Sequence, residues 1–329
     1  MRIALIGLDS FYFTRSLINI LHSTPECTLV ACCLTGYEDE TAQNTGMSVR
    51  ELQEQSNVPV FASVRSMLDS IAVDAVCVAT RPSRVMQVLH VLTECSLPSY
   101  VVKPAIAPDG DIESLAGVVE SYPGILVSGP TGRLHPSIAQ ARRRVLADEI
   151  GKPVVLRVTH QHGCLSSWPK SSWYFALGEA PPTFTLGWYC VDLLSWFNQG
   201  TVSEFQSVAG NLIDHSSPHV DFVKSVCSFT DGAIGSLEIQ FGISWQYPSF
   251  DIEVIGERGA IRIRSPVCEG GLYVPTGIVG FGFQEGESLR SEISQWLRAV
   301  RGDEPPFISR REIITNLKMC KKLHDSLNA

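Results

Sequence analysis

The turn that begins at Gly7 has the sequence context of a phosphate-binding loop. Gly7 follows the apolar residues 3–6, which predict a buried strand, and a helical pattern of apolar residues begins at Phe13. A helix in that place directs free backbone N–H groups at the turn, and such groups bind phosphate. Only the first glycine of the dinucleotide fingerprint G-x-G-x-x-G is present, because Asp9 and Tyr12 occupy the other two glycine positions. Two hypotheses stay open: a modified dinucleotide site, or a vestigial turn.

The neighbouring residues offer further contacts to a dinucleotide. In the segment Asp9-Ser10-Phe11, the carboxylate repels a diphosphate unless it faces away, whereas the Ser10 hydroxyl can cap the helix or donate to a phosphate. The second predicted strand ends in Leu34 and Thr35, without the Asp or Glu that holds a ribose 2′-hydroxyl. Thr35 offers one hydroxyl in that place.

Lys103 is a candidate for acid–base chemistry. It follows the apolar run 100–102, and Pro104 fixes the direction of the backbone after it. Hydride transfer from a secondary alcohol needs a group that accepts the hydroxyl proton and a group that stabilises the oxyanion. An ammonium does the second, and it lowers the pKa of a phenol close to it. The alternative interpretation is an ordinary surface lysine.

The first 128 residues alternate short apolar runs with helical patterns. The apolar runs are residues 3–6, 28–34, 75–79, 100–102 and 125–128. Such runs are typical of buried parallel strands, and their alternation with helices predicts a Rossmann-type, doubly wound α/β sheet. Ligands of these sheets bind beyond the carboxyl ends of the strands. We therefore add Thr80 and Arg81 to the candidate cofactor-binding residues; a solvated loop arginine is the alternative for Arg81.

Residues 129–329 predict an α+β domain that binds substrate and forms oligomers. Strands of one large, mostly antiparallel sheet are predicted at 154–159, 205–212, 221–229, 233–241, 250–255 and 260–264. Helices are predicted at 136–147, 186–198, 288–300 and 310–327. Asp231-Gly232 and Arg258-Gly259 are hairpin signals between successive strands. The open face of this sheet predicts a homodimer, or a tetramer built from dimers.

Composition excludes several classes of protein. The 329 residues are 44% hydrophobic with a formal net charge of −8, which supports a folded core and argues against a nucleic-acid binder. No apolar run reaches the roughly 20 residues of a membrane span, and residues 1–7 lack the pattern of a signal peptide. We expect a cytoplasmic protein with reduced, mostly buried cysteines. No metal is expected, because His160 and His162 share a strand face without a third ligand.

The order of several motifs resembles that of the Gfo/Idh/MocA oxidoreductases, which include glucose–fructose oxidoreductase and inositol dehydrogenase. The motifs are residues 76–80 (VCVAT), 101–104 (VVKP), 132–136 (GRLHP), 149–153 (EIGKP), 187–192 (GWYCVD), 232–236 (GAIGS) and 255–259 (IGERG). They span nearly the whole chain. Departures from the family pattern are Val102 in place of Glu before Lys103, Arg81 in place of Pro after Thr80, and the two missing glycines.

The resemblance implies a nicotinamide cofactor and a sugar-, cyclitol- or polyol-like substrate. It implies that Lys103 both binds and catalyses, and that Tyr189 stands where many relatives have His. Tyr189 lies one helical turn before Asp192, so the two share a helix face. Lys103 and Tyr189 would together handle the proton, and Asp192 would bind a substrate hydroxyl or hold Lys103. A core tyrosine and a surface carboxylate are the alternatives.

Aromatic residues crowd the predicted substrate region. They are Trp168, Trp173, Tyr174 and Trp188. Aromatic faces suit the C–H faces of a cyclic substrate, so we predict Trp168 and Trp188 as substrate-binding residues, together with Arg133. Packing under a long loop is the alternative interpretation.

Three functions fit these observations. The first is an NAD(P)-dependent dehydrogenase or reductase acting on CH–OH groups, with a slight preference for NAD because no Arg or Lys follows Leu34 before Arg50. The second is a member of the fold that has lost turnover and acts as a ligand-binding or sensory protein. The third hydrolyses a glycosidic bond by transient oxidation with bound NAD.

Overall fold

The computed structural model describes residues 1–10, 12–163, 170–176, 178–213, 215, 218–243, 250–265, 269–274, 277–282 and 288–327. Phe11 and Trp168 lie outside the described residues, so their roles stay predictions. The chain divides into two units. The first comprises Met1–Pro130, Ser166–Ala180 and Leu289–Ile314, and the second comprises Thr131–Leu165, Pro181–Ser288 and Thr315–Ala329.

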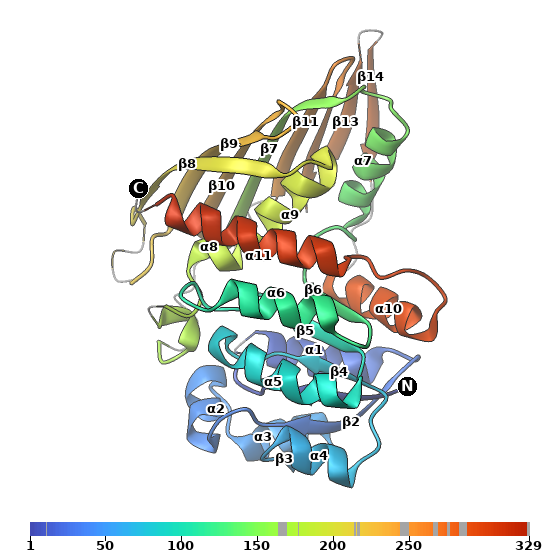
Figure 1. Ribbon diagram of the computed structural model, residues 1–329, viewed down its shortest axis with the longest axis vertical. Helices are drawn as coiled ribbons and strands as arrows, with labels where there is room; N and C mark the ends of the chain where they lie inside the picture. The colour runs from blue at the N-terminus through green and yellow to red at the C-terminus, as the bar shows by residue number, and fades with distance from the viewer. Residues whose placement is uncertain are drawn as a thin grey trace. The chain divides into compact units, whose positions relative to one another are not determined.

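The first unit is built on a six-stranded parallel sheet in the order β3-β2-β1-β4-β5-β6 (Figure 1). Its strands are β1 (Arg2–Ile6), β2 (Thr28–Cys33), β3 (Val60–Phe61), β4 (Ala75–Val78), β5 (Ser99–Val102) and β6 (Leu126–Gly129). This is the predicted Rossmann-type sheet. The strand order reverses between β1 and β4, and ligands of doubly wound sheets bind beyond the carboxyl ends of the strands at that point.

Continuous apolar sequence explains why these strands lie inside the unit. Every residue of β4 is buried, and so is every residue of β1 after Arg2. The helices of this unit are α1 (Phe13–Ser23), α2 (Glu38–Thr45), α3 (Val49–Ser56), α4 (Val64–Ser70), α5 (Pro82–Cys95), α6 (Ile112–Ser121) and α10 (Ser288–Arg301). The side chains of Phe13, Leu17 and Leu21 form the buried stripe of α1, as their spacing predicts.

The second unit contains a mixed sheet of eight strands in the order β14-β13-β12-β11-β7-β10-β9-β8 (Figure 1). Its strands are β7 (Pro153–Gly163), β8 (Val202–Gly210), β9 (Phe222–Phe229), β10 (Ile234–Ile243), β11 (Phe250–Gly256), β12 (Ala260–Ser265), β13 (Glu269–Val274) and β14 (Gly277–Gly282). Among the described strand pairs of this second sheet, only β7–β10 is parallel, so the prediction of a mostly antiparallel sheet is confirmed.

Burial alternates along the strands of this second sheet. On β9, Val223 and Cys227 are buried whereas Lys224 and Val226 are exposed. Such alternation means that one face packs on the core of the unit and the other faces outward. The helices of this unit are α7 (Pro136–Leu146), α8 (Pro182–Thr185), α9 (Gly187–Asn198) and most of α11 (Arg310–Asp325), and α9 contacts β7 and β10.

Two sequence expectations concern the described residues as a whole. All eight cysteines among them are free thiols, and burial raises the pKa of both Cys32 and Cys33 to about 12. No helix in the described ranges combines the length and the apolar character of a membrane span.

Candidate functional site

The turn after β1 brings the backbone against the end of β4. Gly7 has a φ of +88°, and a Cβ at this position would lie 2.5 Å from the Cβ of Thr80. Residues with a side chain fit neither the conformation nor the space, so the turn depends on glycine. After the turn, the hydroxyl of Ser10 accepts a hydrogen bond from the backbone N–H of Phe13 at 3.3 Å, where α1 begins. The first element of a phosphate-binding turn is therefore present.

Asp9 directs its carboxylate at the end of β4. Its Oδ2 accepts hydrogen bonds from the Thr80 hydroxyl and the Arg81 backbone N–H, both at 3.2 Å, and the Nε of Arg81 lies 3.8 Å away. Its Oδ1 is buried and finds no hydrogen-bond partner among the described residues. Burial raises the pKa of Asp9 to about 6, against the opposing effects of the Arg81 backbone N–H and guanidinium. The carboxylate thus uses donors of the kind that bind phosphate.

Thr35 joins the same group of residues from the end of β2. Its hydroxyl and that of Thr80 share a hydrogen bond of 2.5 Å. The structure therefore brings together five of the predicted cofactor residues at the carboxyl edge of β1, β2 and β4. They are Gly7, Asp9, Thr35, Thr80 and Arg81.

Sequence reasoning did not foresee that the segment 170–176 contributes to this edge. The indole Nε1–H of Trp173 donates to the backbone O of Asp9 at 2.6 Å, and the backbone N–H of Trp173 donates to Oδ1 of Asn44 at 2.8 Å. The rings of Trp173 and Tyr174 stack with centroids 4.0 Å apart. Burial raises the pKa of Tyr174 although Ser10 hydrogen-bonds to it. These aromatic side chains belong to the first unit and pack beside the turn.

Lys103 is buried at the carboxyl end of β5. Only 5% of the residue is exposed, and its backbone N–H donates to the carbonyl O of Gly129 at 2.7 Å. Its Nζ lies 5.8 Å from the centroid of the Phe13 ring, within reach of a cation–π interaction. This burial excludes the alternative of an ordinary surface lysine. Because Phe13 opens α1, the ammonium lies near the helix that follows the Gly7 turn.

In the second unit, Tyr189 belongs to an aromatic cluster. The imidazole of His160 stacks on the ring of Phe250 with centroids 4.2 Å apart and meets the ring of Tyr189 edge to face at 4.6 Å. A Cβ at Gly132, whose φ is +79°, would lie 3.3 Å from Phe250 and 3.8 Å from Tyr189. His160 and Phe250 are buried whereas Tyr189 is partly exposed. The candidate phenol therefore has a fixed ring and a histidine beside it.

Arg133 and Asp192 bind each other instead of facing solvent. The guanidinium donates from Nε and Nη2 to the two carboxylate oxygens at 2.8 and 2.6 Å, and Nδ2 of Asn316 donates to Asp192 at 2.6 Å. Arg133 is 2% exposed and Asp192 is 0% exposed. This arrangement excludes a surface carboxylate. Both predicted substrate-binding side chains already have strong partners, so a substrate can reach either only by competing with them.

The remaining candidate residues of the second unit occupy different places. Trp188 is 1% exposed and lies in the core of the unit. The ring of His162 lies 5.4 Å from that of Phe241. Within the described part of the chain, no three His, Cys, Asp or Glu side chains are placed to hold a metal ion.

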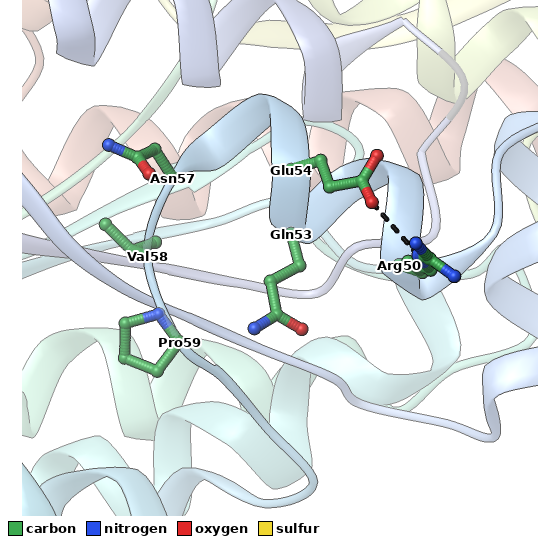
Figure 2. A pocket seen from close by; sticks show the side chains of 6 residues that line it. All are labelled: Arg50, Gln53, Glu54, Asn57, Val58 and Pro59. Carbon is green, nitrogen blue, oxygen red and sulfur yellow. Dashed lines mark hydrogen bonds and ion pairs between the residues drawn. The ribbon is translucent and has the colours of Figure 1, made fainter.

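A surface hollow of the first unit has none of the candidate residues in its lining, and Figure 2 shows the side chains that line it. It is lined by Arg50, Gln53, Glu54, Asn57, Val58 and Pro59. Arg50 and Glu54 form an exposed ion pair of 3.0 Å, one helical turn apart on α3. Pro59 precedes β3, so the hollow lies at the amino end of that strand. The candidate cofactor residues lie at the carboxyl ends, and we assign the hollow no part in the site.

Known structures share this fold. An oxidoreductase from Agrobacterium radiobacter, solved in complex with NAD+, L-tartaric acid and magnesium, is 14% identical, with 100% of this chain and 96% of that chain covered and a TM-score of 0.84. A UDP-N-acetylglucosamine 3-dehydrogenase from Acidithiobacillus ferrooxidans is 16% identical, with 99% and 97% covered and a TM-score of 0.79. A myo-inositol 2-dehydrogenase from Lactobacillus plantarum is 17% identical, with 100% and 97% covered and a TM-score of 0.79. These similarities establish the fold class, a Rossmann-type unit followed by an α+β unit.

One family model matches part of the chain by sequence. Residues 138–262 match the model of the GFO/IDH/MocA C-terminal domain. This match agrees with the resemblance drawn from the order of the motifs. No curated protein matches the chain by sequence.

Proposed function

We propose that the protein is a nicotinamide-dependent oxidoreductase that transfers a hydride between the cofactor and a hydroxyl or carbonyl carbon of a sugar-, cyclitol- or polyol-like molecule. The observation that carries the proposal is the Gly7 turn, which packs against Thr80 at the point where the strand order reverses. The family of the second unit supports it, as do structural neighbours that include an NAD+ complex and an inositol dehydrogenase.

The residues of the first unit fit a dinucleotide, and the charge of Asp9 sets a condition on its binding. Gly7 permits close approach of the backbone, and α1 begins where its N-terminal N–H groups can face an anion. The Asp9 carboxylate uses the Thr80 hydroxyl and the Arg81 N–H as an anionic ligand would. A diphosphate is repelled while Asp9 carries charge, and the raised pKa of this carboxyl makes its neutral form accessible. Arg81 supplies a compensating cation.

The bound nicotinamide supplies the hydride acceptor or donor, and we propose that Lys103 and Tyr189 manage the proton. The buried ammonium of Lys103 stabilises negative charge on the substrate oxygen. The phenol of Tyr189, held by His160 and Phe250, donates or accepts the hydroxyl proton. We propose that Asp192 holds Arg133 in place, since both carboxylate oxygens of Asp192 accept hydrogen bonds from the guanidinium.

An assay of reduced nicotinamide tests the proposal directly. The purified protein is offered NAD+ or NADP+ with a panel of sugars, inositols and polyols, and the absorbance of the reduced cofactor is followed. We expect turnover with at least one substrate, and a loss of about 10²- to 10⁴-fold in Tyr189→Phe. Release of nitrophenol from a nitrophenyl sugar without net cofactor consumption would instead indicate the hydrolase. No turnover together with no nucleotide binding would overturn the proposal.

We also propose that the exposed face of the second sheet pairs with a second copy of the chain. Val208, Val226 and Ile234 are 68%, 50% and 52% exposed, and the strand registers place them on one face. Exposed apolar side chains grouped on a flat sheet are typical of an interface. Native mass measurement should give a dimer or a multiple of it, and Val226→Glu should shift the protein toward monomer. A wild-type protein that is monomeric at all concentrations contradicts this.

A further inference from the structure

Arg84 belongs to α5, and its positively charged guanidinium lies at the loop that follows β2. Its Nη2 donates to both carboxylate oxygens of Glu40, in the first turn of α2, at 3.0 and 2.9 Å. A Cβ at Gly36 would overlap both the guanidinium and the carboxylate. The backbone of the loop therefore lies directly against this ion pair, and a side chain at position 36 would displace it. Arg84 follows β4 in the chain, yet it occupies the end of β2.

The hydrogen bonds already made at this loop leave donors unused. Oε2 of Glu40 also accepts from the backbone N–H of Tyr37 at 3.1 Å, so the carboxylate is well occupied. Nη1 of Arg84 is buried and has no hydrogen-bond partner among the described residues; Nε of Arg81 also lacks a hydrogen bond, although it lies 3.8 Å from Asp9. Buried N–H groups without partners cost free energy, and a ligand that brings acceptor oxygens removes that cost. The loop therefore favours an anionic ligand with several oxygens.

The electrostatic environment supports the same conclusion. Although burial opposes it, hydrogen bonds from Arg84 and from the Tyr37 backbone lower the pKa of Glu40, and Arg81 adds to the effect. Glu40 is thus ionised and holds the guanidinium of Arg84 in position. The other charged groups at this loop are the guanidinium ions of Arg84 and Arg81 and the carboxyl group of Asp9, which follows β1. Two arginines therefore face two carboxylates, and one of those, Asp9, is readily neutralised.

The loop after the second strand has a known position relative to a dinucleotide. In doubly wound sheets it meets the adenosine ribose, where an acid binds the 2′-hydroxyl of NAD or an arginine accommodates the 2′-phosphate of NADP. No acid directly follows β2, and the Thr35 hydroxyl is already bonded to Thr80. Tyr37 is 80% exposed and offers an aromatic face in the same loop. An arginine therefore lies at this loop, and no acid lies among residues 34–36, which directly follow β2.

Resting on the proposed function above, we propose that Arg84 selects NADP(H) over NAD(H) by binding the 2′-phosphate, with Glu40 as the residue that positions its guanidinium. The sequence analysis favoured NAD slightly because it considered only cations that follow Leu34 in the chain. The strand order β2-β1-β4 brings in a cation that this criterion misses.

Titration calorimetry with matched ligands tests the inference. The ligands are NADPH and NADH, and then 2′,5′-ADP and 5′-ADP, which differ from each other by the 2′-phosphate alone. We expect the phosphorylated member of each pair to bind about 10- to 100-fold more tightly, as one charge-assisted contact provides. Arg84→Gln should bring this ratio of affinities close to one while leaving NADH affinity within about twofold of the wild-type value. The ratio should also decrease as salt concentration rises.

The matched control is Arg65→Gln. Arg65 belongs to the same unit and forms an exposed ion pair with Glu94, so its removal changes the net charge equally without touching the loop. It should leave the ratio unchanged, and circular dichroism should show that both variants are folded. Equal affinity of the wild type for NADPH and NADH, or an equal loss of both in Arg84→Gln, would overturn the inference and leave the oxidoreductase proposal standing. Absence of binding by either nucleotide would instead refute the proposed function.

Discussion

The indole N–H of Trp173 donates a 2.6 Å hydrogen bond to the backbone carbonyl O of Asp9, although 164 residues separate the two in the chain. The backbone N–H of Trp173 reaches α2 through Asn44. One residue thus ties the turn after β1 to the helix after β2. Both ends of the proposed nucleotide site depend on this contact.

Trp173→Phe should therefore loosen the turn while keeping an aromatic ring in place. The carbonyl of Asp9 loses its indole donor, and we expect a loss of about 1–3 kcal/mol in the free energy of unfolding. Nucleotide affinity should fall as well, because the turn is less well ordered before binding. Urea unfolding and calorimetry measure the two effects. Arg65→Gln, at an exposed ion pair outside this turn, is the control and should change neither by much.

Asp9 should make stability depend on pH with an unusual sign. Burial raises its pKa from 3.8 to about 6, so the folded protein binds this proton more tightly than the unfolded chain does. The contribution of Asp9 to the free energy of unfolding is therefore largest below about pH 4 and is lost as pH rises to about 6, by up to about 3 kcal/mol. Asp9→Asn should remove this contribution. Urea unfolding from pH 4 to pH 8 compares the two proteins, and identical pH profiles would contradict the expectation.

The same carboxyl group should control nucleotide affinity. An ionised Asp9 repels a diphosphate, so affinity should rise as pH falls through about 6. In Asp9→Asn, binding at pH 7.5 should be about 10-fold tighter than in the wild type and should vary less with pH. Calorimetric titration at several pH values measures this. Weaker binding by the variant at neutral pH would show that the carboxylate itself contacts the nucleotide favourably.

Variants of the Arg133–Asp192 pair distinguish a structural role of Asp192 from a role in substrate binding. Asp192→Asn leaves a buried guanidinium without its counter-ion and should cost about 3–5 kcal/mol in the free energy of unfolding. Replacing both residues with Met and Leu should restore much of that loss, because the buried charges are removed together. If Asp192 binds substrate instead, Asp192→Asn should raise KM with little change in stability. Unfolding curves and steady-state kinetics together distinguish the two roles.

The strands of the first unit were predictable because their sequence is continuously apolar. The runs at 3–6 and 75–79 predict β1 and β4 within a residue at each end. In contrast, β3 has only Val60 and Phe61, too few residues to show a pattern. The strands β13 and β14 also escaped prediction, because five of their twelve residues are glycines and glycine hides the alternation of side chains.

The candidate site was predictable only where its residues directly follow a strand. Gly7, Thr80 and Lys103 could be located this way, because parallel strands place their carboxyl ends at one edge. Arg84, Trp173 and His160 could not, since each acts on a residue that is distant in sequence. Their positions depend on strand order and on the path of a long segment, which local patterns do not encode.

Binding of a nicotinamide nucleotide at the Gly7 turn is the central claim, and a paired titration tests it most directly. Calorimetry with NADPH and NADH is performed on the wild type and on Gly7→Val, whose side chain would collide with Thr80. Our account predicts micromolar binding of at least one nucleotide by the wild type and loss of at least about 100-fold in a folded variant. No binding by the wild type up to millimolar concentration, or equal binding by both proteins, would contradict it.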